Sequence, residues 1–282
     1  MSNQTSTLAT RERVIRPRRG ISSINFRELW LFRELFVFLT IREILVRYKQ
    51  TVIGILWAVI RPVMLMVVFT LIFGKMAKLS SDGVPYPLLT MAGLLPWQFF
   101  QQALTRSSDS LVSNPQFISK IYFPRLIIPF SSILAGIVEF TISFTIFVGL
   151  MVYFKTVPTT AVFWTPAFFL LAVTLASGVG LWFSALNVKY RDIRQLVPFA
   201  VQFGMYISPV GFSTTNVPEK YQFLYSLNPM VGVIDGFRWS LLGAKVPLNM
   251  PGLALSCVIT LLILVSGLYY FKSMERTFAD II

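Results

Sequence analysis

The sequence predicts an all-α membrane protein with six transmembrane helices, an amphipathic interface helix before the first and re-entrant helices before the sixth. Of its 282 residues, 55% are hydrophobic and only 13% are charged, and the mean hydropathy is +0.68. Apolar runs recur that approach the roughly 20 residues needed to cross a bilayer. Lipid admits helices because their backbone hydrogen bonds are satisfied internally. Lys and Arg gather on alternate connecting segments, a pattern typical of multi-pass membrane proteins.

A basic, charged segment precedes the first apolar run. Residues 1–25 are rich in arginine, and we expect a disordered cytosolic arm there. Residues 26–50 mix charges with aromatic and aliphatic side chains at helical spacing, which predicts an amphipathic helix at the membrane interface. An ordinary topology-setting flank is the alternative. The charged end of this predicted helix carries Arg42, Arg47, Tyr48 and Lys49.

The first predicted span, residues 52–73, contains an arginine and a proline in sequence. Pro62 removes a backbone donor, so an interruption or kink of the helix is expected there. A charge near mid-span, such as that of Arg61, costs about 2.5–3.5 kcal/mol on insertion scales, so this side chain should face a cavity or a partner. Glu139 is the other ionisable group at membrane depth, and we expect a buried pairing or a lumen-facing position for it ahead of a proton relay.

Five further apolar segments complete the transmembrane domain, which we assign to residues 51–282. They cover residues 88–104, 126–153, 163–186, 196–212 and 253–271. Gly178 and Gly180 in the fourth span permit close contact between helices. Between the second and third spans, prolines bound a predicted short helix over residues 113–122. Between the fifth and sixth, residues 221–227 and 230–242 are too short or too polar to span, which predicts re-entrant or interfacial helices.

The distribution of positive charge predicts the orientation. The arm, the interface helix, the even-numbered connections and the end of the chain hold 18 Lys and Arg, whereas the odd-numbered connections hold six. Arg61 accounts for the remainder of the 25. Positive residues stay on the cytosolic side, so both termini are expected there.

Several functions are disfavoured by composition. With one cysteine, Cys257, and no histidine, a disulfide framework is excluded and a Cys/His metal site is not expected. No phosphate-binding loop and no Gly-x-Gly-x-x-Gly motif occur, so we expect no ATP or dinucleotide bound by those devices and no cofactor in this chain. The net charge of +13 is explained by topology and anionic lipid, not by nucleic acid.

Three stretches carry a resemblance to a known family. The runs Arg42–Trp57 with Arg61-Pro62 and Phe69–Gly74, the segment Asn187–Ile193, and Leu227–Met230 followed by Arg238 resemble the permease subunits of ABC-2 type polysaccharide exporters. The family more often has an uncharged residue where this chain has Arg61. The resemblance implies a homodimer bound to two copies of a cytosolic ATPase, which carries ATP and Mg²⁺. It also implies export of a lipid-linked glycan such as O-antigen, capsule or teichoic acid across the inner membrane of a bacterium.

The same resemblance assigns roles to individual positions. The connection between the second and third spans would be the helix that couples to the ATPase, and the two helices before the sixth span would be outer gate helices. The candidate coupling residues are Asn114, Phe117, Lys120, Tyr122, Phe123, Arg125, Arg191 and Asp192. The candidate pathway or gate residues are Arg61, Glu139, Tyr221, Tyr225, Asn228 and Arg238.

Two other functions compete with glycan export. An ABC-2 permease for a drug or a small lipid would share the topology and differ in the width of its pathway. A membrane-embedded enzyme such as a glycosyltransferase would show clustered catalytic Asp or His residues, but the five aspartates are scattered. We therefore expect no catalytic residue in this chain, and O-antigen is the favoured cargo.

Overall fold

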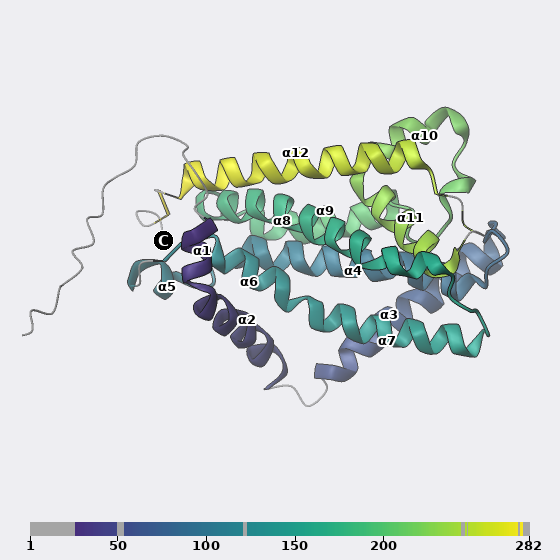
Figure 1. The fold of residues 1–282 in the computed structure, drawn as a ribbon, viewed down its shortest axis with the longest axis horizontal. Coiled ribbons are helices and arrows are strands. Elements are labelled where there is room, and N and C mark those ends of the chain that lie inside the picture. The colour runs from purple at the N-terminus through teal and green to yellow at the C-terminus, as the bar shows by residue number, and fades with distance from the viewer. Residues whose placement is uncertain are drawn as a thin grey trace, which may run out of the picture.

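The computed structural model describes residues 26–49, 54–120, 123–243, 246, 248–275 and 277–278. All regular secondary structure within these residues is helical, as predicted. Figure 1 shows an elongated bundle with α1, α5 and the last described residues at one end and α10 and α11 toward the other. We call these the α5 end and the α10 end. The predicted arm and Tyr122 lie outside the described residues.

The predicted interface helix consists of two pieces, α1 (Phe26–Leu31) and α2 (Arg33–Tyr48), with a break at Phe32. In Figure 1, α2 runs obliquely beside the bundle, where it packs against α6. Leu39 is buried, while apolar side chains such as Phe38 and Val46 are 58% and 66% exposed. Such an exposed apolar face is what a helix at a membrane interface presents to lipid.

The first predicted span is helical without the expected interruption at Arg61-Pro62. The helix α3 (Gly54–Phe69) runs through Pro62 and continues as the π-helix η1 (Thr70–Met76). The departure from α-helical geometry therefore comes two turns after the proline. A π-helical stretch also changes the backbone hydrogen-bonding pattern while keeping most groups paired inside the segment.

The centre of the bundle is α4 (Tyr86–Asp109), which is buried continuously from Leu88 to Phe100. It packs against α3, α6, α7, α8, α9 and α11, as Figure 1 shows for several of them. The helix extends beyond the predicted range of 88–104 because its last turns, including Ser107 and Ser108, are also buried by neighbouring helices. A short helix, α5 (Pro115–Lys120), follows it, as expected for this connection.

The remaining long helices lie alongside α4. The third predicted span is divided at Gly136 into α6 (Ile127–Ala135) and α7 (Ile137–Tyr153). The short 3-10 helix η2 (Thr160–Trp164) leads into α8 (Thr165–Lys189), against which α12 (Met250–Met274) packs. A Cβ added to Gly267 would lie 2.3 Å from the carbonyl oxygen of Gly178, so the two backbones touch. The predicted close contact at Gly178 is confirmed.

Between α8 and α12 the chain forms α9 (Ile193–Ile207), the 3-10 helix η3 (Thr214–Asn216), α10 (Glu219–Ser226) and α11 (Pro229–Leu242). Four helical segments of the described chain are long and apolar enough to cross a membrane. These are Leu56–Met76, Ile127–Tyr153, Thr160–Lys189 and Met250–Met274. The second and fifth predicted spans correspond to α4, of 24 residues, and α9, of 15 residues, so the count of six stays a prediction.

Candidate functional site

The connection between α4 and α6 is held against α2 at the α5 end. Arg42 Nη1 on α2 donates a hydrogen bond to Asn114 Oδ1 at 3.0 Å. The same guanidinium lies 4.9 Å from the ring centre of Phe117 on α5, in cation–π contact. Arg42 of the interface helix therefore contacts two of the predicted coupling residues.

The end of this connection is tied to the last described residues. The Arg125 side chain donates to the Glu275 carbonyl oxygen, and its guanidinium lies 5.9 Å from the ring centre of Phe278. Phe123 is 4% exposed and belongs to the apolar cluster that includes Phe271 and Phe278. These two predicted coupling residues are thus engaged within the chain.

The other predicted coupling residues are placed differently. Arg191 and Asp192, between α8 and α9, are exposed at the α5 end. Nearby, Arg194 forms an exposed ion pair with Asp109, at 3.2 Å from Nε to Oδ1. The side chain of Lys120 lies outside the described part of the chain.

Glu139 joins three helices through one carboxylate. It forms an ion pair with Arg47 of α2 and accepts a hydrogen bond from Arg106 Nη2 of α4 at 2.5 Å. The Tyr48 hydroxyl donates to the same carboxylate at 3.2 Å. Burial and the adjacent negative charge raise the pKa of Tyr48 to about 12, so this hydroxyl keeps its proton at ordinary pH.

Of the two positions expected for Glu139, the structure therefore shows the buried, paired one, with the side chain 9% exposed. Arg61 on α3 is exposed and close enough to interact electrostatically with Glu139. One turn before it, Trp57 is 61% exposed. The lone chain thus presents a cation and an indole ring on the outer face of α3.

The helix α9 has two contrasting faces. Val197, Val201 and Met205 are buried, on the side that packs against α4. The opposite face exposes two amides and three rings. These are Gln195, Phe199, Gln202, Phe203 and Tyr206, which we call the α9 face.

The geometry of the α9 face is regular. Gln195, Phe199, Gln202 and Tyr206 follow one another at spacings of four, three and four residues, which aligns them on one side of a helix. Phe199 and Phe203 stack with ring centres 6.1 Å apart and are 69% and 60% exposed. Amides and flat rings therefore alternate along the helix.

At the α10 end, Arg238 of α11 is fully buried, and its guanidinium donates hydrogen bonds to three backbone carbonyl oxygens. Nε donates to Leu89 at 3.2 Å, Nη1 to Phe212 at 2.8 Å and Nη2 to Val210 at 2.9 Å. Arg238, predicted as a gate residue, therefore links α11 to α4 and to the segment after α9 through hydrogen bonds.

A buried carboxylate, that of Asp235, lies one turn before Arg238 on α11. Both of its oxygens accept hydrogen bonds from the Thr214 hydroxyl, at 2.7 and 2.8 Å. Burial raises the pKa of Asp235 to about 6, although Arg238 and the Thr214 hydrogen bond act in the opposite direction.

The remaining predicted gate residues lie on or beside α10. Asn228 caps α11 by accepting from the Met230 amide at 3.0 Å, and it donates to Ser208 Oγ at 2.9 Å. Tyr221 is 52% exposed. The Tyr225 hydroxyl is buried without a hydrogen-bond partner among the described residues.

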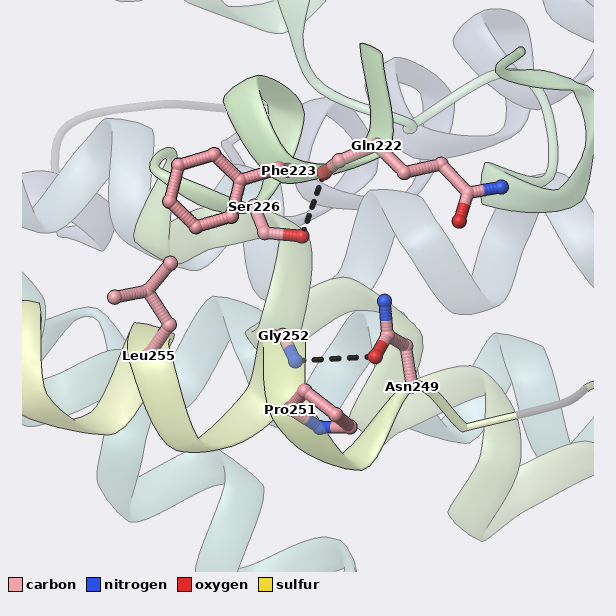
Figure 2. A pocket seen from close by; sticks show the side chains of 7 residues that line it. All are labelled: Gln222, Phe223, Ser226, Asn249, Pro251, Gly252 and Leu255. Carbon is pink, nitrogen blue, oxygen red and sulfur yellow. Dashed lines mark hydrogen bonds between the residues drawn. The ribbon is translucent and has the colours of Figure 1, made fainter. Parts of the chain in front are cut away.

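A cavity of about 340 Å³ lies between α10 and the first turns of α12. Figure 2 shows it from close by, with Phe223 and Leu255 on one side and the amides of Gln222 and Asn249 on the other. Sequence reasoning singled out neither this cavity nor the α9 face. The spacing of Gln195, Phe199, Gln202 and Tyr206 was the signal for the α9 face, whereas nothing local in the sequence joins α10 to α12.

The chain matches the family described as "ABC-2 type transporter" over residues 34–242. An "O-antigen export system permease protein RfbA" of Klebsiella pneumoniae is 26% identical over 250 residues, which cover 88% of this chain and 95% of the relative. A protein of the same name from Myxococcus xanthus is 25% identical over 256 residues, or 90% and 97% of the two chains. The "Polysialic acid transport protein KpsM" of Escherichia coli is 23% identical over 248 residues, or 84% and 92%.

Proposed function

The chain belongs to the ABC-2 type transporter family, and we propose that it is the permease subunit of an exporter that moves a lipid-linked polysaccharide, with O-antigen as the favoured cargo. The names of the relatives support this assignment, since two of them are O-antigen export permeases and one transports polysialic acid. Their matches cover 84–90% of this chain and 92–97% of the relatives, so the comparison is not confined to one segment.

The α9 face is the observation that carries the proposal. A helix side that faces lipid is expected to be apolar, because an amide in hydrocarbon loses its hydrogen bonds to water at a cost of several kcal/mol. Gln195 and Gln202 are exposed on this face between Phe199 and Tyr206. A sugar chain offers hydroxyls to the amides and apolar C–H faces to the rings, so it suits such a surface.

A single copy leaves the α9 face and the outer face of α3 uncovered, which supports a second copy of the chain as partner. We propose that the homodimer encloses a route lined by these faces and that six spans cross the inner membrane in each copy. Arg61 would then face the route near Glu139, because a mid-span cation facing lipid would be costly. The positive charge of Arg61 would attract anionic groups of the cargo.

The energy for transport is proposed to come from two copies of a separate ATPase, which binds ATP and Mg²⁺. The α5 end would be cytosolic, with both termini on that side. The half-buried Phe117 with its partner Arg42 and the exposed pair Arg191 and Asp192 would form the contact surface. Phe123 and Arg125 would support this surface from within, because their side chains are engaged inside the chain.

The test is export in a bacterial strain that lacks the native gene and carries wild-type or variant permease. The double variant Phe199→Ala, Phe203→Ala should reduce surface polysaccharide and leave lipid-linked polysaccharide inside the cell. We expect a loss of about two- to tenfold for each ring, the value of one aromatic contact. Phe163→Ala is the matched control, since Phe163 is 84% exposed and lies outside α9.

Full export by the double variant at normal protein levels would remove the α9 face from the route. Wild-type permease that restores no surface polysaccharide, but changes the efflux of a drug or a small lipid, would replace glycan export by the competing function. Membrane levels of each variant, measured by immunoblot, separate a transport defect from a failure to insert.

A further inference from the structure

The cavity between α10 and α12 has the dimensions of a small-ligand site. Its volume of about 340 Å³ lies at the lower end of the range of roughly 300–1,000 Å³ found for ligand pockets. The walls come from one side of α10 and from Asn249 with the first turns of α12. The lining residues are Gln222, Phe223, Ser226, Asn249, Pro251, Gly252 and Leu255.

One side of the cavity is apolar. Figure 2 shows the Phe223 ring above Leu255, with Pro251 below. Phe223 is 74% exposed, so most of its ring is available to a ligand. A large exposed ring beside a cavity is a recurrent feature of binding sites, because it provides contact area with little loss of side-chain freedom.

The other side of the cavity offers one donor and one acceptor. Asn249 Oδ1 accepts from the Gly252 amide at 3.1 Å and so caps α12, but no hydrogen bond within the described chain uses Nδ2. Gln222 Nε2 donates to the Val217 carbonyl at 3.3 Å, which leaves Oε1 unused there. In Figure 2, the Asn249 amino group points up toward Ser226, and the Gln222 oxygen points down toward the same space.

We propose that this cavity binds one sugar unit of the exported glycan. A pyranose ring has an apolar C–H face that can stack on Phe223. Its hydroxyls both donate and accept, which matches the Asn249 amino group and the Gln222 oxygen. An acyl chain would fill the apolar side but would offer no hydrogen-bond partner to the Asn249 amino group or to the Gln222 oxygen.

The assignment rests on the proposed function, because the glycan is the source of the sugar. The cavity lies between two helices that α11 separates in the sequence, so a bound sugar would contact α10 and α12 together. Binding would therefore hold α10 against α12 at the end of the bundle opposite α5. The chemical class of the ligand is a neutral hexose or deoxyhexose, since none of the described residues that line the cavity is charged.

The test uses the permease together with its ATPase in lipid nanodiscs and measures saturation-transfer-difference NMR. The probes are D-glucose, D-galactose, D-mannose and L-rhamnose, each added alone. At least one sugar should be saturated by the wild-type complex. Phe223→Leu and Gln222→Met, which keep side-chain size but remove the ring or the amide, should each reduce this signal by about two- to tenfold.

Two further variants make the test specific. Asn249→Asp keeps the oxygen that caps α12 but removes the amino donor, so the fold should persist while sugar binding falls. Phe163→Leu removes an exposed ring elsewhere and should leave the signal as in wild type. No saturation of any probe, or a signal that the cavity variants leave unchanged, would overturn the site.

A photoreactive phospholipid distinguishes the competing occupant. If it labels the α10–α12 cavity in the wild type and the cavity variants abolish that labelling without any sugar signal, the sugar assignment is wrong. Export by the same complexes is measured in parallel. Wild-type export without sugar binding would refute the cavity alone, whereas absence of glycan export by the wild type would refute the proposed function.

Discussion

Replacing Arg238 by methionine should destabilise the α10 end more than any surface change. The side chain is fully buried and donates to three carbonyl oxygens that methionine leaves without donors. An unsatisfied buried group costs about 1–3 kcal/mol. Water entry and local relaxation would offset part of the sum, so we expect about 3–5 kcal/mol, as for other broken buried charge networks.

Thermal unfolding of the purified permease in detergent, followed by tryptophan fluorescence, measures this loss. At roughly 2–4 °C per kcal/mol for a chain of this size, Arg238→Met should lower the melting temperature by about 6–20 °C. Arg238→Lys should fall between wild type and Arg238→Met, because one ammonium group cannot reproduce the planar fork of a guanidinium. Lys220→Met is the control for a charge lost from exposed α10 and should change stability by less than about 0.5 kcal/mol.

The buried neighbour of Arg238 adds a pH dependence. The folded-state pKa of Asp235 is raised to about 6, so the folded protein favours the neutral carboxyl. The stability that this group contributes is therefore fully present below the pKa of the unfolded chain and is lost as pH rises through about 6. Without Arg238 the carboxylate loses its nearby cation, and the deficit of Arg238→Met should be larger at pH 8 than at pH 5. If Arg238→Met had the same melting temperature as Lys220→Met at both pH values, this reasoning would be refuted.

Three further predictions concern the α5 end and the topology. Phe117→Ala should weaken the binding free energy of the ATPase by about 1–3 kcal/mol, the range for a truncated interface anchor, and so reduce its co-purification. Full ATPase binding and full export by this variant would assign the coupling role to another segment. Glu139→Gln should lower the free energy of unfolding by about 1–3 kcal/mol. This is less than for a fully buried ion pair, because the Arg47 side chain is 39% exposed to solvent. The same variant should make α2 more sensitive to limited proteolysis, and an unchanged digestion pattern would show that the carboxylate does not hold the helix. In whole cells without Cys257, an impermeant thiol reagent should label Glu219→Cys but not Gln116→Cys; the reverse pattern would invert the proposed orientation.

The apolar runs predicted the helices well because burial in lipid and burial in the bundle require the same side chains. The helical segment Ile127–Tyr153 agrees in extent with the predicted span of residues 126–153, yet its division at Gly136 has no counterpart in the apolar pattern. The expected interruption at Pro62 was wrong, since α3 runs through this residue, whereas the expected kink stays a prediction. These differences are local, and the order of the helices follows the predicted one throughout the described chain.

The candidate site was less accessible to sequence reasoning, because its contacts join distant elements. Nothing near Arg125 in the sequence indicates its contact with Glu275, and nothing near Glu139 indicates the ion pairs to Arg47 and Arg106. Arg238 resembled a gate residue through its neighbours, but only the packing of α11 against α4 reveals its three carbonyl partners. Residues far apart along the chain become one site through tertiary packing.

The contact between Gly178 and Gly267 has a genetic consequence. A Cβ at either position would meet backbone atoms of the opposite helix at 2.9 Å or less, so alanine at one position should force α8 and α12 apart. Once the helices have separated, a second alanine at the other position meets open space and adds little damage. Defects at these two sites should therefore be strongly non-additive. The pair would appear in a mutational scan as one epistatic unit, intolerant of the first substitution and permissive to the second.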